Sequence, residues 1–229
     1  PGSVFLHSLD INMKNLKIAW SVDLGGTIPV DPAVKKVVED AAKVFRDLGC
    51  DVEEAYPDLS DAEEIFQVFR AYEIELTNAS VYEQFKEHLK PSLLWNIETG
   101  MDLKGADIAR AERLRHDLYH RVRQFFETYD AFILPVNQVP PFDGDMDYPR
   151  EIDGKPMTTY LEWMQSRCMI TVTGAPALSV PAGFSPDGLL IGLQIVGSHR
   201  SAVDVLRIGH AFEQATLFGN VRPKIAFKM

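Results

Sequence analysis

A strand, a helix and a second strand follow one another within residues 17–55, and this succession constrains the fold more than any other feature. Residues 17–22 form a short apolar run that predicts a buried strand. Asp31 is a suitable N-cap for a helix over 32–48, whose apolar residues recur at helical spacing, and residues 51–55 predict the second strand. Because two strands joined through a helix pair in parallel, the pattern predicts an α/β fold.

The middle of the chain, residues 60–130, is predicted to be mainly helical. Residues 60–63 carry a capping-box pattern that marks the start of one helix, and a shorter helical segment is predicted over 91–100. The clearest helix is predicted over 106–129, where apolar residues lie three or four positions apart and Arg115 is the one break.

After the long helix, the chain is predicted to be rich in strands separated by glycine and proline. The predicted strands cover residues 131–134, 170–172, 177–180 and 190–196. The last two are expected to pair as an antiparallel hairpin, and a final helix is predicted over 201–216. Residues 136–156 form a loop that is long enough to be either functional or mobile. These elements predict a mixed β-sheet flanked by helices, in a single domain that covers residues 1–229.

Composition narrows the classes of partner. The 229 residues carry a net charge of −10, which argues against nucleic acid as a partner. No apolar stretch reaches the roughly 20 residues that a membrane helix requires, so no membrane partner is expected. Two cysteines, Cys50 and Cys168, are too few for a disulfide framework. Cysteine usage therefore favours a reducing, cytoplasmic location.

Two patterns with metal-binding spacing fail on inspection. Residues 143–147 resemble the start of a calcium loop, but Tyr148 stands where that loop requires glycine and Gly154 where it requires a bidentate acid. His116 and His120 are four residues apart on the predicted long helix, but no third ligand is evident nearby. The sequence therefore predicts no metal site, and it contains no pattern that points to a cofactor.

Patterns for nucleophilic catalysis also fail. The chain has no Gly-x-Ser-x-Gly elbow, and Ser179 lies in a predicted strand where packing is its expected role. Cys168 has no histidine nearby to lower the pKa of its thiol. Gly25 and Gly26 are not followed by the residues of a phosphate-binding loop. From spacing alone, no catalytic residue can be assigned.

Residues 173–184 and 187–197 carry the most informative pattern in the chain. They read Thr-Gly-Ala-Pro-Ala-Leu-Ser-Val-Pro-Ala-Gly-Phe and Asp-Gly-Leu-Leu-Ile-Gly-Leu-Gln-Ile-Val-Gly. Together with segments 18–26, 95–98 and 125–142, in that order, they resemble the C-terminal part of the amidase signature family of serine amidohydrolases. The resemblance covers nearly the whole chain and implies that family's α/β fold, a mixed sheet flanked by helices.

The resemblance also implies a hydrolase of carboxylic amides. In this family a nucleophilic serine, a second serine before a cis peptide bond and a lysine act together through an acyl-enzyme. A Gly/Ser-rich segment supplies the two serines and the oxyanion-hole amides. This chain contains no such segment, and each of its lysines follows the position expected for the catalytic one. The chain is therefore expected to be the C-terminal half of an amidase, with no catalytic residue of its own, and to be inactive alone.

The resemblance further suggests which residues wall the substrate pocket. Trp163, Met164 and Ile170, which precede the Gly-Ala-Pro stretch, are the predicted substrate-binding residues, and the loop over 140–147 is expected to contribute. Ordinary core packing is the alternative role for each. Gln194 is expected to tie a buried backbone group. The expected ligand is a small-molecule amide, bound together with the missing N-terminal half.

Other interpretations remain open. The chain could be a non-catalytic remnant that serves as a binding or interaction module, or it could resemble the A-type component of a glutamine amidotransferase. Glutamine-specific relatives carry an acidic residue before the Gly-x-Pro stretch, whereas residues 162–165 here are apolar apart from Glu162 and Gln165. A general, aromatic or aliphatic amide is therefore the preferred substrate. Bare strand edges at the missing half would also favour a homo-oligomer.

Overall fold

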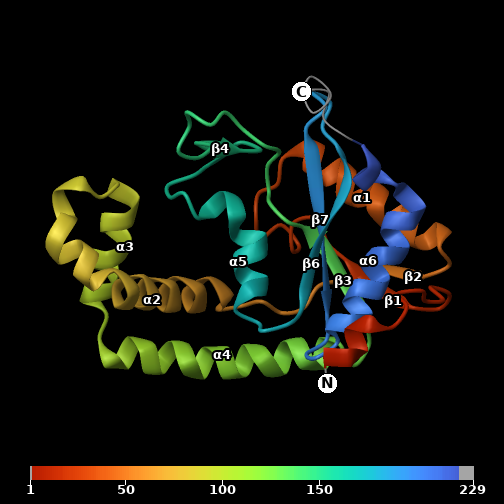
Figure 1. Cartoon of the computed structure of the whole chain (residues 1–229), viewed down its shortest axis with the longest axis horizontal. Helices are drawn as coiled ribbons and strands as arrows, with labels where there is room; N and C mark the ends of the chain where they lie inside the picture. Colours follow the sequence, from red (N-terminus) through yellow and green to blue (C-terminus); the bar gives the residue numbers. More distant parts are fainter. Residues whose placement is uncertain (1, 222–229) are drawn as a thin grey trace.

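Five strands form one mixed sheet in the computed structural model of the chain, which describes residues 2–221 (Figure 1). The strands are β1 (Lys17–Trp20), β2 (Asp51–Glu54), β3 (Ala131–Pro135), β6 (Ala177–Phe184) and β7 (Leu190–Gly197). Their order across the sheet is β2-β1-β3-β7-β6. β1 pairs in parallel with β2 and β3, while β7 pairs antiparallel with β3 and β6. The predicted α/β class, the parallel pairing and the C-terminal hairpin are confirmed.

Six α-helices accompany this sheet within residues 2–221. They are α1 (Pro32–Asp47), α2 (Ala62–Phe85), α3 (Pro91–Asp102), α4 (Gly105–Phe125), α5 (Gln165–Thr171) and α6 (Ala202–Thr216). Short 3-10 helices cover Gly2–Leu6, Lys86–His88, Glu162–Met164 and Phe218–Asn220. None of the helices within the described part of the chain combines the length and apolar character needed to cross a membrane.

The start of α1 follows directly from its sequence. A side-chain oxygen of Asp31 accepts a hydrogen bond from the backbone N–H of Ala33 at 2.8 Å, and Pro32 occupies the first helical position. One face of the helix is buried, comprising Val34, Val37, Val38, Ala41, Ala42 and Phe45. Gly49 follows the helix with φ of 91°, a backbone conformation in which glycine is favoured.

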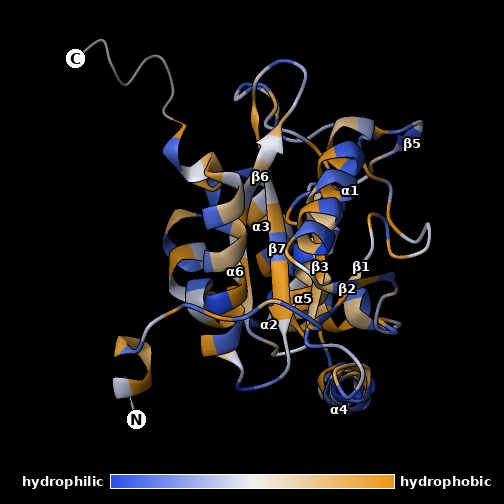
Figure 2. Cartoon of the chain, turned by 90° about the vertical axis from the view of Figure 1, so that its right-hand side faces the viewer, coloured by the Kyte–Doolittle hydropathy of each residue, from blue (hydrophilic) through white to orange (hydrophobic). Residues whose placement is uncertain are grey.

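Helices cover both faces of the sheet. α1 and α6 lie together on one face, where the rings of Phe45 and Phe212 stack with centroids 5.1 Å apart. Figure 2 shows the apolar strand β7 between these two helices, and Figure 1 shows α5 on the opposite side of the sheet. Alternate strand residues therefore face two different layers, as expected for a sheet that is buried between helices.

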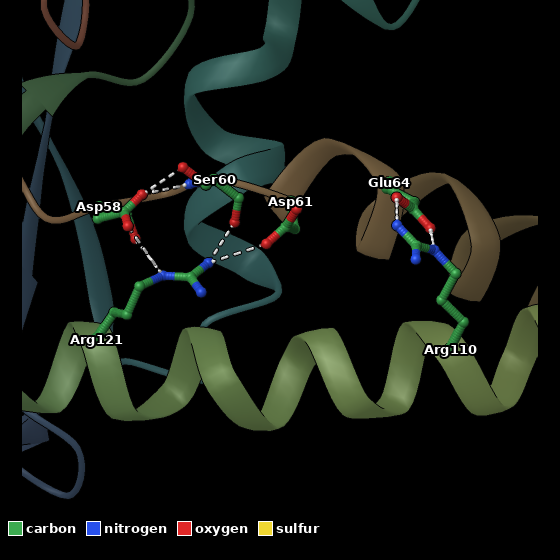
Figure 3. A network of polar contacts seen from close by, with 6 residues as sticks. All are labelled: Asp58, Ser60, Asp61, Glu64, Arg110 and Arg121. Carbon is green, nitrogen blue, oxygen red and sulfur yellow. Dashed lines mark hydrogen bonds and ion pairs between the residues drawn. The ribbon is translucent and has the colours of Figure 1, made fainter.

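The helices α2, α3 and α4, here called the helical arm, extend to one side of the sheet (Figure 1). Arg115, the one break in the apolar face of α4, lies over the ring of Phe69 in α2 at 4.8 Å. Arg110 of α4 pairs with Glu64 of α2, its Nε 2.6 Å from Oε1 (Figure 3). The break in the pattern is thus a packed cation over an aromatic ring, which the spacing of apolar residues does not reveal.

The capping box predicted over 60–63 is wrong. Asp61 precedes α2 with φ of 69° and makes no side-chain cap hydrogen bond. The hydroxyl of Ser60 donates to Asp58 instead, while the guanidinium of Arg121 donates to the Ser60 carbonyl (Figure 3). A side chain from α4, 61 residues away, therefore organises the segment that the local pattern assigned to a cap.

The long helix predicted over 106–129 ends four residues early, at Phe125. Asp130 explains the difference, because its side chain and its backbone N–H both bond the backbone of Lys17 at 2.8 Å. The chain must turn before Asp130 to bring β3 alongside β1. Tyr129 accordingly lies outside the helix, with its hydroxyl donating to Glu53 of β2 at 2.9 Å.

The strand predicted over 170–172 is also wrong, because Ile170 and Thr171 end α5 and Val172 is its C-cap. The β-branched run suggested a strand, but Ile170 is buried on the inner face of the helix together with Ser166, Cys168 and Met169. The hydroxyl of Thr171 bonds the carbonyl of Arg167 one turn earlier, at 2.9 Å. Burial of this helical face overrides the local preference for strand.

Residues 136–156, predicted as a loop, include a small hairpin of β4 (Glu151–Ile152) and β5 (Lys155–Pro156). Asp153 and Gly154 form its turn with φ of 49° and 78°. Two consecutive residues with positive φ are typical of the Asp-Gly hairpin turn. The rest of this segment contributes to the candidate site.

Candidate functional site at the carboxyl edge of the parallel strands

The parallel strands β1, β2 and β3 place their carboxyl ends at one edge of the sheet. In open α/β sheets ligands bind at this edge, because the loops that leave it carry polar groups above a rigid frame. Two hollows lie among these loops, here called the Tyr56 hollow and the Trp163 hollow after one lining residue each, with volumes of about 690 and 500 Å³. Two others, of about 770 and 780 Å³, are lined mainly by residues of the arm and the loops beside it.

The Tyr56 hollow lies beside a left-handed turn that follows β1. Leu24, Gly25 and Gly26 have φ of 54°, 67° and 83° in succession. A Cβ atom on Gly25 would lie 2.0 Å from the hydroxyl oxygen of Tyr56, so both the backbone conformation and the close approach require glycine there. The buried side chain of Leu24 shows that packing sustains this unusual conformation.

Carboxylates line the outer part of the Tyr56 hollow, and they are already engaged. The hydroxyl and backbone N–H of Ser60, with Arg121 nearby, hold the pKa of the Asp58 carboxyl below its ordinary value. Arg121 also lies 3.4 Å from a carboxylate oxygen of Asp61. These acids fasten the helical arm to the sheet and leave little capacity for a ligand.

The Trp163 hollow lies where the chain leaves β3. It is lined by residues of segment 136–142, by Trp163, and by residues of β6 and β7. The ring of Trp163 meets the ring of Phe142 edge-on, with centroids 5.2 Å apart. Its lining is mostly apolar, and the polar side chains among the lining residues are Asn137, Trp163 and Ser179.

Gln138 holds this edge together, although it is fully buried. Its side-chain Nε2 donates to the carbonyl of Pro29 at 2.8 Å, and its Oε1 accepts from the backbone N–H of Ser166. Its backbone N–H donates to the carbonyl of Trp163, and its carbonyl accepts from the N–H of Asp31. One residue thus joins the loop before α1, the segment after β3 and the start of α5.

The three predicted substrate-binding residues occupy different environments. Trp163 lines a hollow together with residues 140–142 of the predicted contact loop. Met164 is half-buried, and its sulfur accepts a contact from Arg167 at 3.0 Å. Ile170 is 2% exposed and packs in the main core. The structure brings Trp163 and the loop together but places Ile170 beneath the surface, and the binding roles stay predictions.

Gln194 does not make the expected tie to a backbone group. Its side chain is 7% exposed, and its Nε2 is buried without a hydrogen-bond partner among the described residues. Gln194 pairs directly with Ser179 across the β6–β7 hairpin, so both side chains lie on the same face of the sheet. Ser179 lines the Trp163 hollow, whereas Gln194 is its cross-strand partner and is not itself a lining residue.

The two cysteines, and the serines at positions 166 and 179, show no feature of an activated nucleophile. Burial raises the pKa of the Cys50 and Cys168 thiols to about 11 each. The hydroxyl of Ser166 donates to the carbonyl of Val136 at 2.8 Å, a structural hydrogen bond. Ser179 is exposed on β6, and its hydroxyl has no hydrogen bond to a basic group within the described range. None of these four side chains is activated for attack.

Metal-binding groups are likewise missing from the part of the chain that the structure describes. No three His, Cys, Asp or Glu residues within 2–221 are arranged to hold a metal ion. The rings of His116 and His120 meet edge-on, with centroids 4.6 Å apart, on the exposed side of α4. His116 and His120, whose spacing suggested metal ligands, are therefore two imidazole rings in contact on the surface of α4.

Glu162, the acid that directly precedes Trp163 and Met164, is engaged locally. Its carboxylate accepts the backbone N–H groups of Thr158 and Thr159 and the hydroxyl of Thr158. These three donors satisfy most of its capacity, so the carboxylate is poorly placed to hold a substrate amine.

Sequence reasoning missed the two polar residues that follow β3. Asn137 and Gln138 interrupt an apolar run directly after a buried strand, at its carboxyl end. That position was the available signal, because a polar pair at the end of a buried parallel strand lies at the ligand-binding edge.

Comparison with known proteins places these features in a family. A family model of amidases matches residues 4–206. An acylamidase of Rhodococcus erythropolis is 29% identical over 218 residues, which cover 93% of this chain and 45% of that protein. The A component of the glutamyl-tRNA(Gln) amidotransferase of Lactiplantibacillus plantarum is 29% identical over 247 residues, which cover 96% of this chain and 49% of that protein.

A solved structure shares the fold. The crystal structure of a bacterial aryl acylamidase of the amidase signature family superposes with a TM-score of 0.81 at 23% identity. The match covers 94% of this chain and 48% of that one. The chain thus spans about half the length of the curated relatives it matches.

Proposed function

We propose, from the premise that the chain belongs to the amidase family, that it forms one wall of the substrate pocket of an enzyme that hydrolyses a small-molecule amide. The observation that carries the proposal is the Trp163 hollow at the carboxyl edge of β3, among residues that contain no activated nucleophile. A chain that binds and orients, but does not attack, has the properties of a pocket wall.

The chemistry in this proposal comes from residues outside the 229. A lysine accepts a proton from the nucleophilic serine through the bridging serine, and the serine oxygen attacks the amide carbonyl. The amine leaves with a proton, and water then hydrolyses the acyl-enzyme to release the acid. Backbone N–H groups stabilise the oxyanion in both steps. This chain alone is expected to be inactive.

The open edge of the sheet supports a second contribution, to assembly. β6 is one of the two outermost strands of the sheet among the described residues, β2 being the other, and its Ala177 and Ser179 are exposed. An eight-residue edge strand with free backbone groups is a template for pairing with another strand. We propose that the remainder of the amidase, or a second copy of this chain, pairs there.

The preferred substrate is a general, aromatic or aliphatic amide. The engagement of Glu162 by Thr158 and Thr159 supports this choice over glutamine, since a free carboxylate would be needed to hold the amine. The similarity to an acylamidase of Rhodococcus erythropolis agrees with it. The similarity to the A component of a glutamyl-tRNA(Gln) amidotransferase keeps glutamine as the second candidate substrate.

A cytoplasmic location is part of the same proposal. Cys50 and Cys168 are both free and buried, and no pair of cysteines in the chain is joined. Free thiols of this kind persist in a reducing compartment.

Hydrolysis assays test the proposal directly. The 229-residue chain should release aniline from N-phenylacetamide only at the background rate, whereas the same chain recovered from its native cells with bound companions should hydrolyse it. A hydrolysis rate that survives repurification of the isolated chain and scales with its concentration would contradict the proposal, because the catalytic residues would then lie within this chain. If the chain recovered from its native cells has no bound companion and hydrolyses no amide, the alternative is favoured, in which the chain is a non-catalytic binding module.

A further inference from the structure

Unpartnered polar atoms gather around the Trp163 hollow. Buried polar atoms without a hydrogen-bond partner are rare in folded proteins, and each one calls for an explanation. Asn137 Oδ1 and Trp163 Nε1 are two such atoms, and both residues line the hollow. Gln194 Nε2 is a third, on the sheet face that also carries the lining residue Ser179. The concentration of such atoms at one place points to a polar group that binds there.

The two atoms on the lining residues have opposite hydrogen-bonding characters. The indole Nε1–H of Trp163 can only donate, and Oδ1 of Asn137 can only accept. A secondary amide presents the matching pair, a carbonyl oxygen that accepts and an N–H that donates. An ester of the same shape offers the carbonyl but no donor.

The rest of the hollow favours an apolar substituent. Its other lining residues include Val136, Val139, Phe142, Leu190 and Ile191. At about 500 Å³ the hollow is within the size range of small-molecule sites, which combine apolar walls with a few placed polar groups. The lining carries no charged side chain, so a charged ligand would be poorly accommodated.

The donor is held in place before a ligand binds. Gln138 fixes the backbone of Trp163 through its carbonyl, and the ring of Phe142 packs edge-on against the indole. The acceptor is adjustable, because the terminal torsion of an asparagine side chain is soft. Both atoms are covered in the described conformation, so binding requires rotation of the Asn137 carboxamide and a small displacement of Phe142.

We infer that the Trp163 hollow is a binding subsite for a secondary amide with an apolar substituent. The ligand carbonyl accepts from Trp163 Nε1, and the ligand N–H donates to Asn137 Oδ1. Asn137 is thereby the residue that distinguishes an amide from an ester. The inference rests on the proposed function only in taking this amide to be the substrate, since binding itself requires no residue outside the chain.

A titration of the 229-residue chain tests the inference. The chain has three tryptophans, so an amide-region spectrum of ¹⁵N-labelled protein is expected to show three indole N–H signals, assigned by Trp→Phe substitution. N-methylbenzamide is the probe, and methyl benzoate is its matched control without the N–H. The amide should shift the Trp163 signal saturably and bind about fivefold more tightly than the ester, the effect of one hydrogen bond.

Variants separate the two contacts. Asn137→Ala should weaken amide binding about fivefold and leave ester binding unchanged, while Trp163→Phe should weaken both about fivefold. Trp20→Phe is the matched control, because Trp20 Nε1 is also buried and unpartnered. Trp20 pairs with Ile133, which pairs with Ile195, so it lies on the sheet face opposite Gln194 and should leave both affinities unchanged.

Equal affinity for amide and ester would overturn the inference, as would a shift confined to the signals of Trp20 or Trp95. The comparison of the two probes on the unaltered chain holds even where a variant fails to fold. Binding without any hydrolysis by the native assembly would remove the proposed function and leave the subsite. Hydrolysis by the native assembly, without amide-selective binding by this chain, would leave the proposed function and overturn the subsite.

Discussion

In the sheet, every residue of β3 is buried and two phenylalanine rings stack between α1 and α6, whereas α2 in the helical arm buries only three of its 24 residues. The arm is joined to the rest of the molecule by a few buried apolar residues, such as Ile65 and Leu118, and by directional contacts, such as those of Arg121 with the segment before α2 (Figure 3). Apolar burial provides most of the folding free energy, while exposed polar contacts contribute little each. The sheet is therefore expected to determine stability, and the arm to determine local geometry.

Removing a ring from the sheet core should have the largest effect. Phe212 is fully buried against Phe45, so Phe212→Ala should lower the free energy of unfolding by about 3–5 kcal/mol through lost burial and a cavity. Urea denaturation measures the change. Phe69→Ala in the arm is the matched control, since Phe69 is only half-buried beneath Arg115. Equal losses for the two variants would remove the distinction between the regions.

Gln138→Ala should have the next largest effect. It leaves the carbonyl of Pro29 and the backbone N–H of Ser166 without their side-chain partner at a buried position. The expected loss is about 2 kcal/mol in the free energy of unfolding, again read from urea denaturation. Gln124→Ala on the exposed side of α4 serves as its control and should change stability little. An unchanged free energy of unfolding in Gln138→Ala would mean that other contacts hold the carboxyl edge of the sheet.

Arg121→Met should cost about 1 kcal/mol, less than either core change. The guanidinium bonds the carbonyls of Asp58 and Ser60, but it remains a quarter exposed, so solvent screens part of its contribution. Its clearest effect should be faster amide exchange in the first turn of α2, measured by hydrogen exchange. Arg113→Met is the control on the same helix, because Arg113 is exposed and takes no part in the ion pairs that its neighbours Arg115 and Arg123 form. Comparable exchange in both variants would show that Arg121 does not fasten the arm.

The smallest effect should be a pH dependence from Asp58. Ser60 and Arg121 lower the pKa of the Asp58 carboxyl in the folded state below the 3.8 of the free group. A lowered folded pKa stabilises the protein at higher pH, and that contribution is lost as pH falls through the folded value. Stability should therefore fall more steeply from about pH 5 to about pH 2 in the unaltered chain than in Asp58→Asn. Parallel profiles of unfolding free energy against pH would contradict the expectation.

The contrast between the two regions also explains what could be predicted from the sequence. The α/β class, the parallel pairing of β1 with β2, and the β6–β7 hairpin follow from apolar periodicity and turn residues, because burial imposes those patterns. The start of α1 follows from Asp31 and Pro32, whose effects are local. The predictions that proved wrong lie where distant contacts override local preference, as Arg121 does at residues 60–63 and the buried face of α5 does at residues 170–172.

The candidate site was less accessible to sequence reasoning. The resemblance pointed to Trp163, which does line a hollow, but also to Ile170, which packs in the core. Nothing in the local sequence shows which face of a short helix such as α5 is buried. Asn137 and Gln138 were missed because their importance comes from their position after β3. Gln138 also bonds segments near Pro29 and Ser166, and hydrogen bonds between distant segments produce no periodic pattern in the sequence.

The central claim is that this chain forms a pocket wall without a nucleophile, and labelling with a serine-reactive fluorophosphonate tests it most directly. Intact mass measured under denaturing conditions reports which chain carries the probe. The account predicts that the 25.7 kDa chain stays unlabelled while a companion or longer chain from the same native preparation takes up the probe. A stoichiometric label on the 25.7 kDa chain, mapped to a residue such as Ser179 or Ser166, would contradict the account.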